Sequence, residues 1–161
     1  MITPSPDTVL HPLRGQARAL HEWLTTFHFL SVVIDPFTKE SASLLKTANR
    51  VLAQFAGSNA RTNYVVTAAA ADARDFLGPF ADETLVFCDV DRVFVKQLAL
   101  TQLPALVFLR IDGQVMASAE GWNPLEWRAV TDYVARAVAW SKPLIPAPGD
   151  PGAFTGTPAL V

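Results

Sequence analysis

The stretch from Leu98 to Trp122, LALTQLPALVFLRIDGQVMASAEGW, decides the fold of this chain of 161 residues. Its middle part, LPALVFLRI, is an apolar run that indicates a strand. Asp112-Gly113 follows, and this dipeptide is typical of a tight hairpin turn. The residues after the turn, QVMASAE, are therefore expected to form a second strand beside the first.

The segments on either side of this hairpin alternate between strand and helix patterns. The β-branched run FLSVVI predicts a strand buried on both faces, and Asp35-Pro36 after it is a helix-start signal for a helix that runs to Gly57. Asn123-Pro124 repeats that signal before the last helix. The segments between are a strand at NYVVTA, a helix at ADARDFLGPF broken at Gly78-Pro79, a strand at TLVFCDV and a short helix at RVFVKQLAL. This order predicts a mixed sheet flanked by helices.

The two ends of the chain have compositions of their own. Residues 1–27 are expected to form a loose arm and an amphipathic helix, because apolar residues recur there at steps of three and four. These are Leu10, Leu13, Ala17, Leu20, Leu24 and Phe27. Residues 143–161 are rich in proline and glycine and almost uncharged, so we expect a flexible tail or an extended segment laid on a partner. Residues 28–142 form the domain between them.

Composition and charge narrow the class of protein. The chain has the length of one domain, and half of its residues are hydrophobic. A net charge of −2 suggests neither a nucleic acid nor an anionic membrane surface as partner. We find no signal-peptide pattern and no run that could span a bilayer. Cys88 is the only cysteine, which excludes an internal disulfide and favours a cytoplasmic location.

The order of motifs over residues 28–141 resembles the thioredoxin superfamily. Pro104 matches the proline that follows a cis peptide bond in that family, Asp112-Gly113 the turn, and Gly121 the glycine after the last strand. The unit VVTAAAADARDFLGPF is similar to an insertion in peroxiredoxin-like and membrane-anchored thioredoxin-like reductase branches. The resemblance implies a thioredoxin-like α/β fold, a three-layer sandwich with a mixed central sheet, here with an extra N-terminal helix.

The segment DPFTKES, residues 35–41, lies where the family carries its chemistry. Thr38-Lys39-Glu40-Ser41 replaces the CxxC motif of thioredoxins, and Val32 replaces their buried acid. Against the peroxiredoxin motif, Ser41 takes the place of the peroxidatic cysteine. A hydroxyl group cannot carry out thiol–disulfide exchange or form a sulfenic acid. The segment is therefore interpreted as a helix start whose Asp35, Thr38 and Ser41 bind backbone donors.

These features favour a non-catalytic role without a cofactor: a binding, adaptor or chaperone-like protein, or an accessory subunit of a larger complex. The resemblance implies a groove where thioredoxins receive an extended peptide, and a protein partner could pair with it as a strand. The expected groove residues come from the helix start, from the loop before the hairpin and from the start of the last helix. They are Pro36, Phe37, Thr38, Lys39, Ser41, Gln102, Leu103, Pro104 and Trp122.

Two alternatives stay open. Cys88 lies mid-strand in LVFCDV, where a cysteine is usually an inert core residue, but it could serve a redox sensor or an oxidoreductase that works with an external thiol. The chain could also be a stable subunit of a complex, held by its tail and by Trp23 and Trp127, which fall off the buried helix stripes. Trp122 lies beside Trp127 at the start of the last helix, and all three tryptophans are expected to be exposed or half-buried. His21 and His28 are not expected to bind a metal. The sequence leaves the partner and the oligomeric state open.

Overall fold

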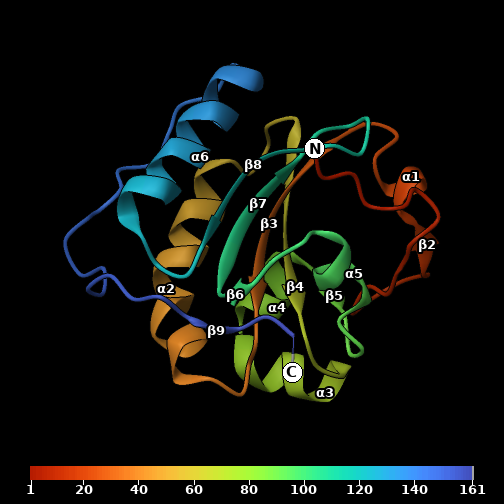
Figure 1. Cartoon of the computed structure of the whole chain (residues 1–161), viewed down its shortest axis with the longest axis horizontal. Helices are drawn as coiled ribbons and strands as arrows, with labels where there is room; N and C mark the ends of the chain where they lie inside the picture. The colour runs from red at the N-terminus through yellow and green to blue at the C-terminus, as the bar shows by residue number, and fades with distance from the viewer. Residues whose placement is uncertain (161) are drawn as a thin grey trace.

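The computed structural model describes residues 1–160, and its core is a five-stranded sheet with the order β5-β4-β3-β7-β8 (Figure 1). Strands β3, β4 and β5 are parallel to one another, whereas β7 is antiparallel to both of its neighbours, β3 and β8. The mixed sheet predicted from the sequence is confirmed. The strands are β3 (His28–Ile34), β4 (Ala60–Val66), β5 (Leu85–Cys88), β7 (Ala105–Leu109) and β8 (Val115–Glu120).

Helices cover both faces of this sheet, which confirms the predicted three-layer arrangement (Figure 1). One face packs against α2 (Lys39–Gln54), α3 (Ala70–Leu77), α4 (Phe80–Glu83) and α6 (Pro124–Ala137). The other face packs against α1 (Leu20–Trp23) and α5 (Val93–Gln97). Within residues 1–160, no helix combines the length and the apolar character needed to cross a membrane.

Strand β3 is the centre of the core because its side chains are buried on both faces. Leu30, Val32 and Ile34 belong to the cluster under α2 and α6, while Phe29 and Val33 belong to the cluster under α5. Side chains alternate along a strand, so an unbroken apolar run supplies both layers at once. The predicted burial of FLSVVI on two faces is confirmed.

The predicted N-terminal amphipathic helix is wrong. Over residues 10–27 the structure contains only the four-residue α1, preceded by a small antiparallel pair of β1 (Val9–Leu10) and β2 (Arg18–Ala19). Several of the apolar residues that suggested a helix are nevertheless buried, namely Leu10, Leu20 and Leu24. The spacing of three and four residues therefore predicted buried positions correctly but predicted the wrong backbone conformation.

A tertiary contact explains why this segment is extended. The backbone N–H of Leu13 donates to the carbonyl oxygen of Val86 at 2.7 Å, and the N–H of Cys88 donates to the carbonyl oxygen of His11 at 2.8 Å. These bonds satisfy the outer edge of β5, which no other strand covers. Gly15, with φ of +93°, turns the chain back toward β2.

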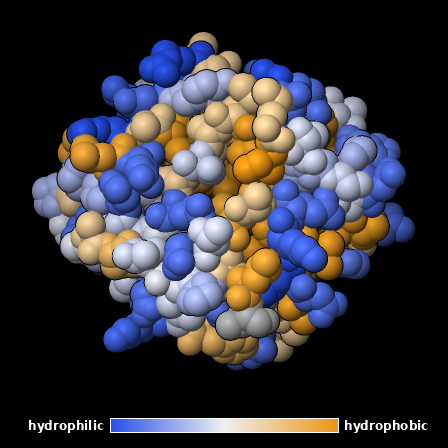
Figure 2. Space-filling model, viewed as in Figure 1, coloured by the Kyte–Doolittle hydropathy of each residue, from blue (hydrophilic) through white to orange (hydrophobic). Residues whose placement is uncertain are grey.

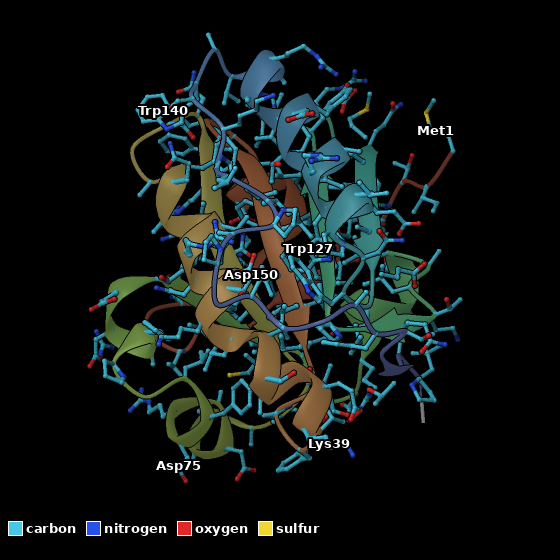
Figure 3. The ribbon with its side chains drawn as sticks, turned by 90° about the vertical axis from the view of Figure 1, so that its left-hand side faces the viewer. Met1, Lys39, Asp75, Trp127, Trp140 and Asp150 are labelled. Carbon is cyan, nitrogen blue, oxygen red and sulfur yellow. The ribbon has the colours of Figure 1, made fainter. Side chains whose placement is uncertain are left out.

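The C-terminal segment lies on the chain's own domain, where the sequence predicted a flexible tail or a segment on a partner. The first part of residues 143–160 runs between α2 and α6 as far as Asp150, which lies over α2, and the chain then crosses toward β6 (Figure 3). There the Asp150 carboxylate pairs with the Arg50 guanidinium at 2.9 Å. Further on, β9 (Thr157–Pro158) pairs antiparallel with β6 (Gln102–Leu103). We call residues 151–160 the tail segment.

The expected exposure of the tryptophans is wrong. Trp122 and Trp127 are fully buried and Trp23 is 8% exposed. The Trp122 indole N–H donates to the carbonyl oxygen of Pro151 at 2.8 Å, and that of Trp127 donates to Gly121 at 2.9 Å. Helix periodicity misses these positions because their partners lie outside the helix. Trp23, Trp122 and Trp127 therefore offer no interaction surface.

The tail segment crosses Gly121 so closely that a side chain there would collide with it. A Cβ atom at Gly121 would lie 2.2 Å from the carbonyl oxygen of Thr155, and φ is +68°. Gly113 has φ of +88°, but a Cβ atom added there would have no neighbour within 4 Å. A substitution at Gly113 therefore measures the cost of backbone strain without a steric collision. We expect Gly113→Ala to cost about 1–2 kcal/mol from strain alone, and Gly121→Ala to cost about 1–3 kcal/mol more from steric displacement.

Urea unfolding of both variants and of the unmodified chain measures this difference. Equal midpoints for Gly113→Ala and Gly121→Ala would show that the tail segment does not press on Gly121.

Candidate functional site

The DPFTKES segment works as a helix start in the structure. Helix α2 begins at Lys39, and the Thr38 hydroxyl oxygen accepts from the backbone N–H of Ser41 at 3.3 Å. The Asp35 carboxylate accepts from the N–H of Phe37 at 3.0 Å, and the Ser41 hydroxyl accepts from the N–H of Asp35 at 3.1 Å. The interpretation of Asp35, Thr38 and Ser41 as side chains that bind backbone donors is confirmed.

The two halves of the expected groove lie at the same end of the sheet. Val33 on β3 is paired with Ala105 on β7, which places the loop after β3 beside Leu103 and Pro104. The bond between Leu103 and Pro104 is cis, as the resemblance implies. Phe37 is 71% exposed at this end of the sheet.

Several expected groove residues are covered rather than open. Ser41, Leu103, Pro104 and Trp122 are buried, whereas Pro36, Thr38 and Gln102 are half-buried and Lys39 at the start of α2 is exposed. The chain's own tail segment covers β6 and Trp122. The tail segment therefore lies over part of the region that the sequence predicts as a partner site.

The tail segment is held there mainly through its backbone. Phe154 and Trp122 exchange two backbone hydrogen bonds, at 2.8 and 3.0 Å, and the N–H of Ala159 donates to the carbonyl oxygen of Thr101 at 3.0 Å. Between these contacts, β9 is paired with β6. Figure 2 shows apolar residues on the surface around the end of the chain, and Leu160 there is 49% exposed.

Arg92 joins the tail segment to the helix-start loop, a role that the sequence analysis missed. One guanidinium nitrogen of Arg92 donates to the carbonyl oxygen of Ala159 at 2.6 Å, and the other donates to the Asp35 carboxylate at 2.9 Å. The Arg92 side chain is 15% exposed and that of Asp35 is 10% exposed. No local pattern indicates this contact, because Arg92 and Asp35 are far apart in sequence.

Cys88 lies at the carboxyl end of β5, on the same edge of the sheet as the DPFTKES segment. The register pairs Ile34 with Val66 and Val66 with Cys88, so the thiol is two strands away from the helix start of α2. Cys88 is half-buried and lines a cavity of about 560 Å³. Burial raises the pKa of the thiol, and the nearby Arg74 guanidinium offsets part of that rise.

The cavity beside Cys88 is formed by three parts of the chain. Val9 and His11 come from the N-terminal arm, Ala69 and Ala70 lie at the start of α3, and the segment between β5 and α5 completes the wall. The Asp89 carboxylate faces α5 and accepts the N–H groups of Phe94 and Val95. Asp89 therefore acts as a cap for α5.

His28 contacts the turn between β7 and β8. His28 accepts the backbone N–H of Ile111 at 2.9 Å through Nδ1, and burial followed by the charge of Arg110 lowers its pKa. Among the side chains that the structure describes, no group of three His, Cys, Asp or Glu residues is placed to hold a metal ion.

Comparison with solved structures finds the same fold in redox proteins. A candidate thiol:disulfide interchange protein DsbE from Chlorobium tepidum superposes with a TM-score of 0.68 at 16% identity, over 84% of this chain and 96% of that one. A candidate thioredoxin from Neisseria meningitidis also gives 0.68, at 14% identity over 85% and 91% of the two chains. A cysteine-to-serine mutant of PrxQ from Xylella fastidiosa gives 0.65, at 13% identity over 85% and 98%.

No family model and no curated protein sequence matches this chain. One further structure of this fold, a Mycobacterium tuberculosis disulfide oxidoreductase, is described as secreted, so the cytoplasmic location stays a prediction. The mixed sheet, the helices on its two faces and the similarity to these structures agree with one another. The chain has a thioredoxin-like fold, with Thr38-Lys39-Glu40-Ser41 in place of the CxxC motif.

Proposed function

We propose that this chain is a single-thiol redox protein that uses Cys88 together with an external thiol. The observation that carries the proposal is the position of Cys88 on a cavity at the carboxyl edge of the parallel strands. The thiol:disulfide interchange protein and the disulfide oxidoreductase of similar fold support it by analogy. The chemistry moves to Cys88 because Thr38 and Ser41 cannot perform it.

The reaction requires no second cysteine in the chain. The Cys88 thiol loses its proton to solvent, and the thiolate attacks one sulfur atom of an external disulfide R–S–S–R. The external S–S bond breaks, Cys88–S–S–R forms, and the released RS⁻ takes up a proton. A different external thiolate, R′S⁻, then attacks the R sulfur of the mixed disulfide, which restores Cys88 and forms R–S–S–R′. The external thiol thus replaces the missing resolving cysteine.

The walls of the cavity favour neutral or cationic disulfides. Val9, Val90 and Val93 line it and are each at least half exposed, so its entrance is apolar. Asp89 and Asp91 also line it and would repel an anionic disulfide. We therefore choose 2-hydroxyethyl disulfide, which is small and neutral, as the probe.

Intact mass measurement of the folded chain after exposure to 2-hydroxyethyl disulfide tests the thiol. We expect one mixed disulfide, which disappears when 2-mercaptoethanol is added and never forms in Cys88→Ser. The proposal fails if Cys88 is modified only after the chain is unfolded in urea, because the thiol would then be an inert core residue.

The pH dependence of Cys88 alkylation is a second test. Only the thiolate reacts with iodoacetamide, and burial raises the pKa of this thiol above its ordinary value. We therefore expect the rate at neutral pH to be lower than that of a free thiol and to rise still above about pH 9. Arg74→Gln removes the favourable charge and should lower the rate at neutral pH further. A plateau reached below about pH 8 would contradict the raised pKa.

A second candidate function is the non-catalytic binding role expected from the sequence. The observation that favours it is the groove itself, which already accepts an extended strand beside Pro104. The polar side chains of the DPFTKES segment are used to bind backbone donors, and Phe37 next to them is exposed. Under this proposal the exposed Phe37 contacts a protein partner.

Purification of the tagged chain from its own cells separates the two functions. A binding role predicts a stoichiometric partner that survives Cys88→Ser and is lost in Phe37→Asp. Leu125→Asp is the matched control, because Leu125 is 65% exposed on a helix outside the DPFTKES segment. Partners that appear only as thiol-dependent adducts, and vanish in Cys88→Ser, contradict the binding role and support the redox role.

A further inference from the structure

The tail segment occupies its groove in the way that a separate peptide would. Its strand β9 pairs with β6, and its Phe154 exchanges a pair of backbone hydrogen bonds with Trp122. Ala159 is the only fully buried residue of the segment. Main-chain bonds of this kind hold an added strand, while a few side-chain pockets select it. We propose that the tail segment is a reversible internal ligand, and that the groove binds an extended segment of another protein with the same spacing of small residues.

The close contacts define the sequence that the groove accepts. A Cβ atom at Gly156 would lie 2.5 Å from the carbonyl oxygen of Leu103, so this position requires glycine. Three residues later, Ala159 is fully buried, so we expect a larger side chain at this position to displace its neighbours. Phe154 is half-buried, while Thr155 and Pro158 are exposed. The expected partner carries an aromatic residue, glycine two positions later and alanine three positions after that.

A buried anchor precedes the tail segment and does not depend on it. The Asp150 side chain is 5% exposed and is fixed by the guanidinium of Arg50, the hydroxyl of Thr47 and the N–H of Ala147. After this anchor, Gly152 is exposed, and a Cβ atom at this position would lie in open space. Gly152 and Ala153 can therefore act as a hinge, and the anchor keeps the detached segment close to the groove.

This inference rests on the second candidate function and is independent of Cys88. Its closing test uses the full chain and a fluorescein-labelled peptide with the sequence of residues 153–160, AFTGTPAL. In Gly156→Val the internal ligand cannot return to the groove, so we expect the peptide to bind at least about tenfold tighter than to the unmodified chain. Thr155→Val is the matched control in the same segment, because the Thr155 side chain is exposed, and it should behave as the unmodified chain.

A peptide with valine at the position of Gly156 tests whether the peptide binds in the groove beside Leu103. We expect this peptide not to bind. Circular dichroism first establishes that Gly156→Val is folded. If the folded variant binds the peptide no better than the unmodified chain, the proposal is overturned.

A disulfide lock keeps the proposal testable if Gly156→Val does not fold. Gln102 and Pro158 are directly paired in adjacent antiparallel strands, a separation that a disulfide can bridge. Gln102→Cys and Pro158→Cys are combined with Cys88→Ser. The oxidised chain should not bind the peptide, and reduction should restore the affinity of the unmodified chain. Equal binding by both forms would place the peptide elsewhere and overturn the proposal.

Two further outcomes are distinguished by the same samples. Sedimentation of the unmodified chain should show a monomer, since a dimer that exchanges its tail segments would contradict an internal ligand. If the peptide fails to bind while a Phe37-dependent partner persists, the inference fails but the binding function stands. If both are absent, the binding function fails as well.

Discussion

Strand β3 is hydrogen-bonded on both of its edges, to β4 in parallel and to β7 in antiparallel, and the position of every candidate residue depends on this pairing. The parallel partners bring the carboxyl ends of β3, β4 and β5 to one edge of the sheet, which places Cys88 near the DPFTKES segment. The antiparallel partner brings Pro104 to the same edge. The apolar side chains of β3 fix this register, because a shift by one residue would exchange its two buried faces.

In redox proteins of this fold, one edge of the sheet carries the chemistry. In this chain, the same edge carries different side chains. The hydroxyl groups of Thr38 and Ser41 bind backbone donors, and Arg92 connects the Asp35 carboxylate to the carbonyl oxygen of Ala159. A thiol remains only at Cys88, two strands away. Redox chemistry and strand binding would therefore use separate parts of the same edge, so each can be removed without the other.

The fold could be predicted where local patterns and tertiary structure agree. FLSVVI, the hairpin around Asp112-Gly113 and the Asn123-Pro124 helix start carry their own signals, and Asn123 does accept the N–H groups of Leu125 and Glu126. The predicted N-terminal helix does not form, because residues 11–13 are extended and hydrogen-bonded to the edge of β5. The expected exposure of Trp122 and Trp127 is wrong because their hydrogen-bond partners come from other segments.

For the candidate site, the backbone-binding role of DPFTKES could be predicted from the sequence. The Arg92 contacts and the place of the tail segment could not, because they depend on residues far apart in sequence.

The chain's own tail segment lies beside Pro104, and hydrogen exchange of individual backbone amides measured by NMR can test this placement. Phe154 and Ala159 donate to backbone carbonyl oxygens of the domain, whereas Gly152 is exposed in the hinge. We expect the amides of Phe154 and Ala159 to exchange at least about tenfold more slowly than those of an unstructured peptide, while the amide of Gly152 exchanges freely. Exchange of all three amides at the unstructured rate would contradict it, because the groove would then be open.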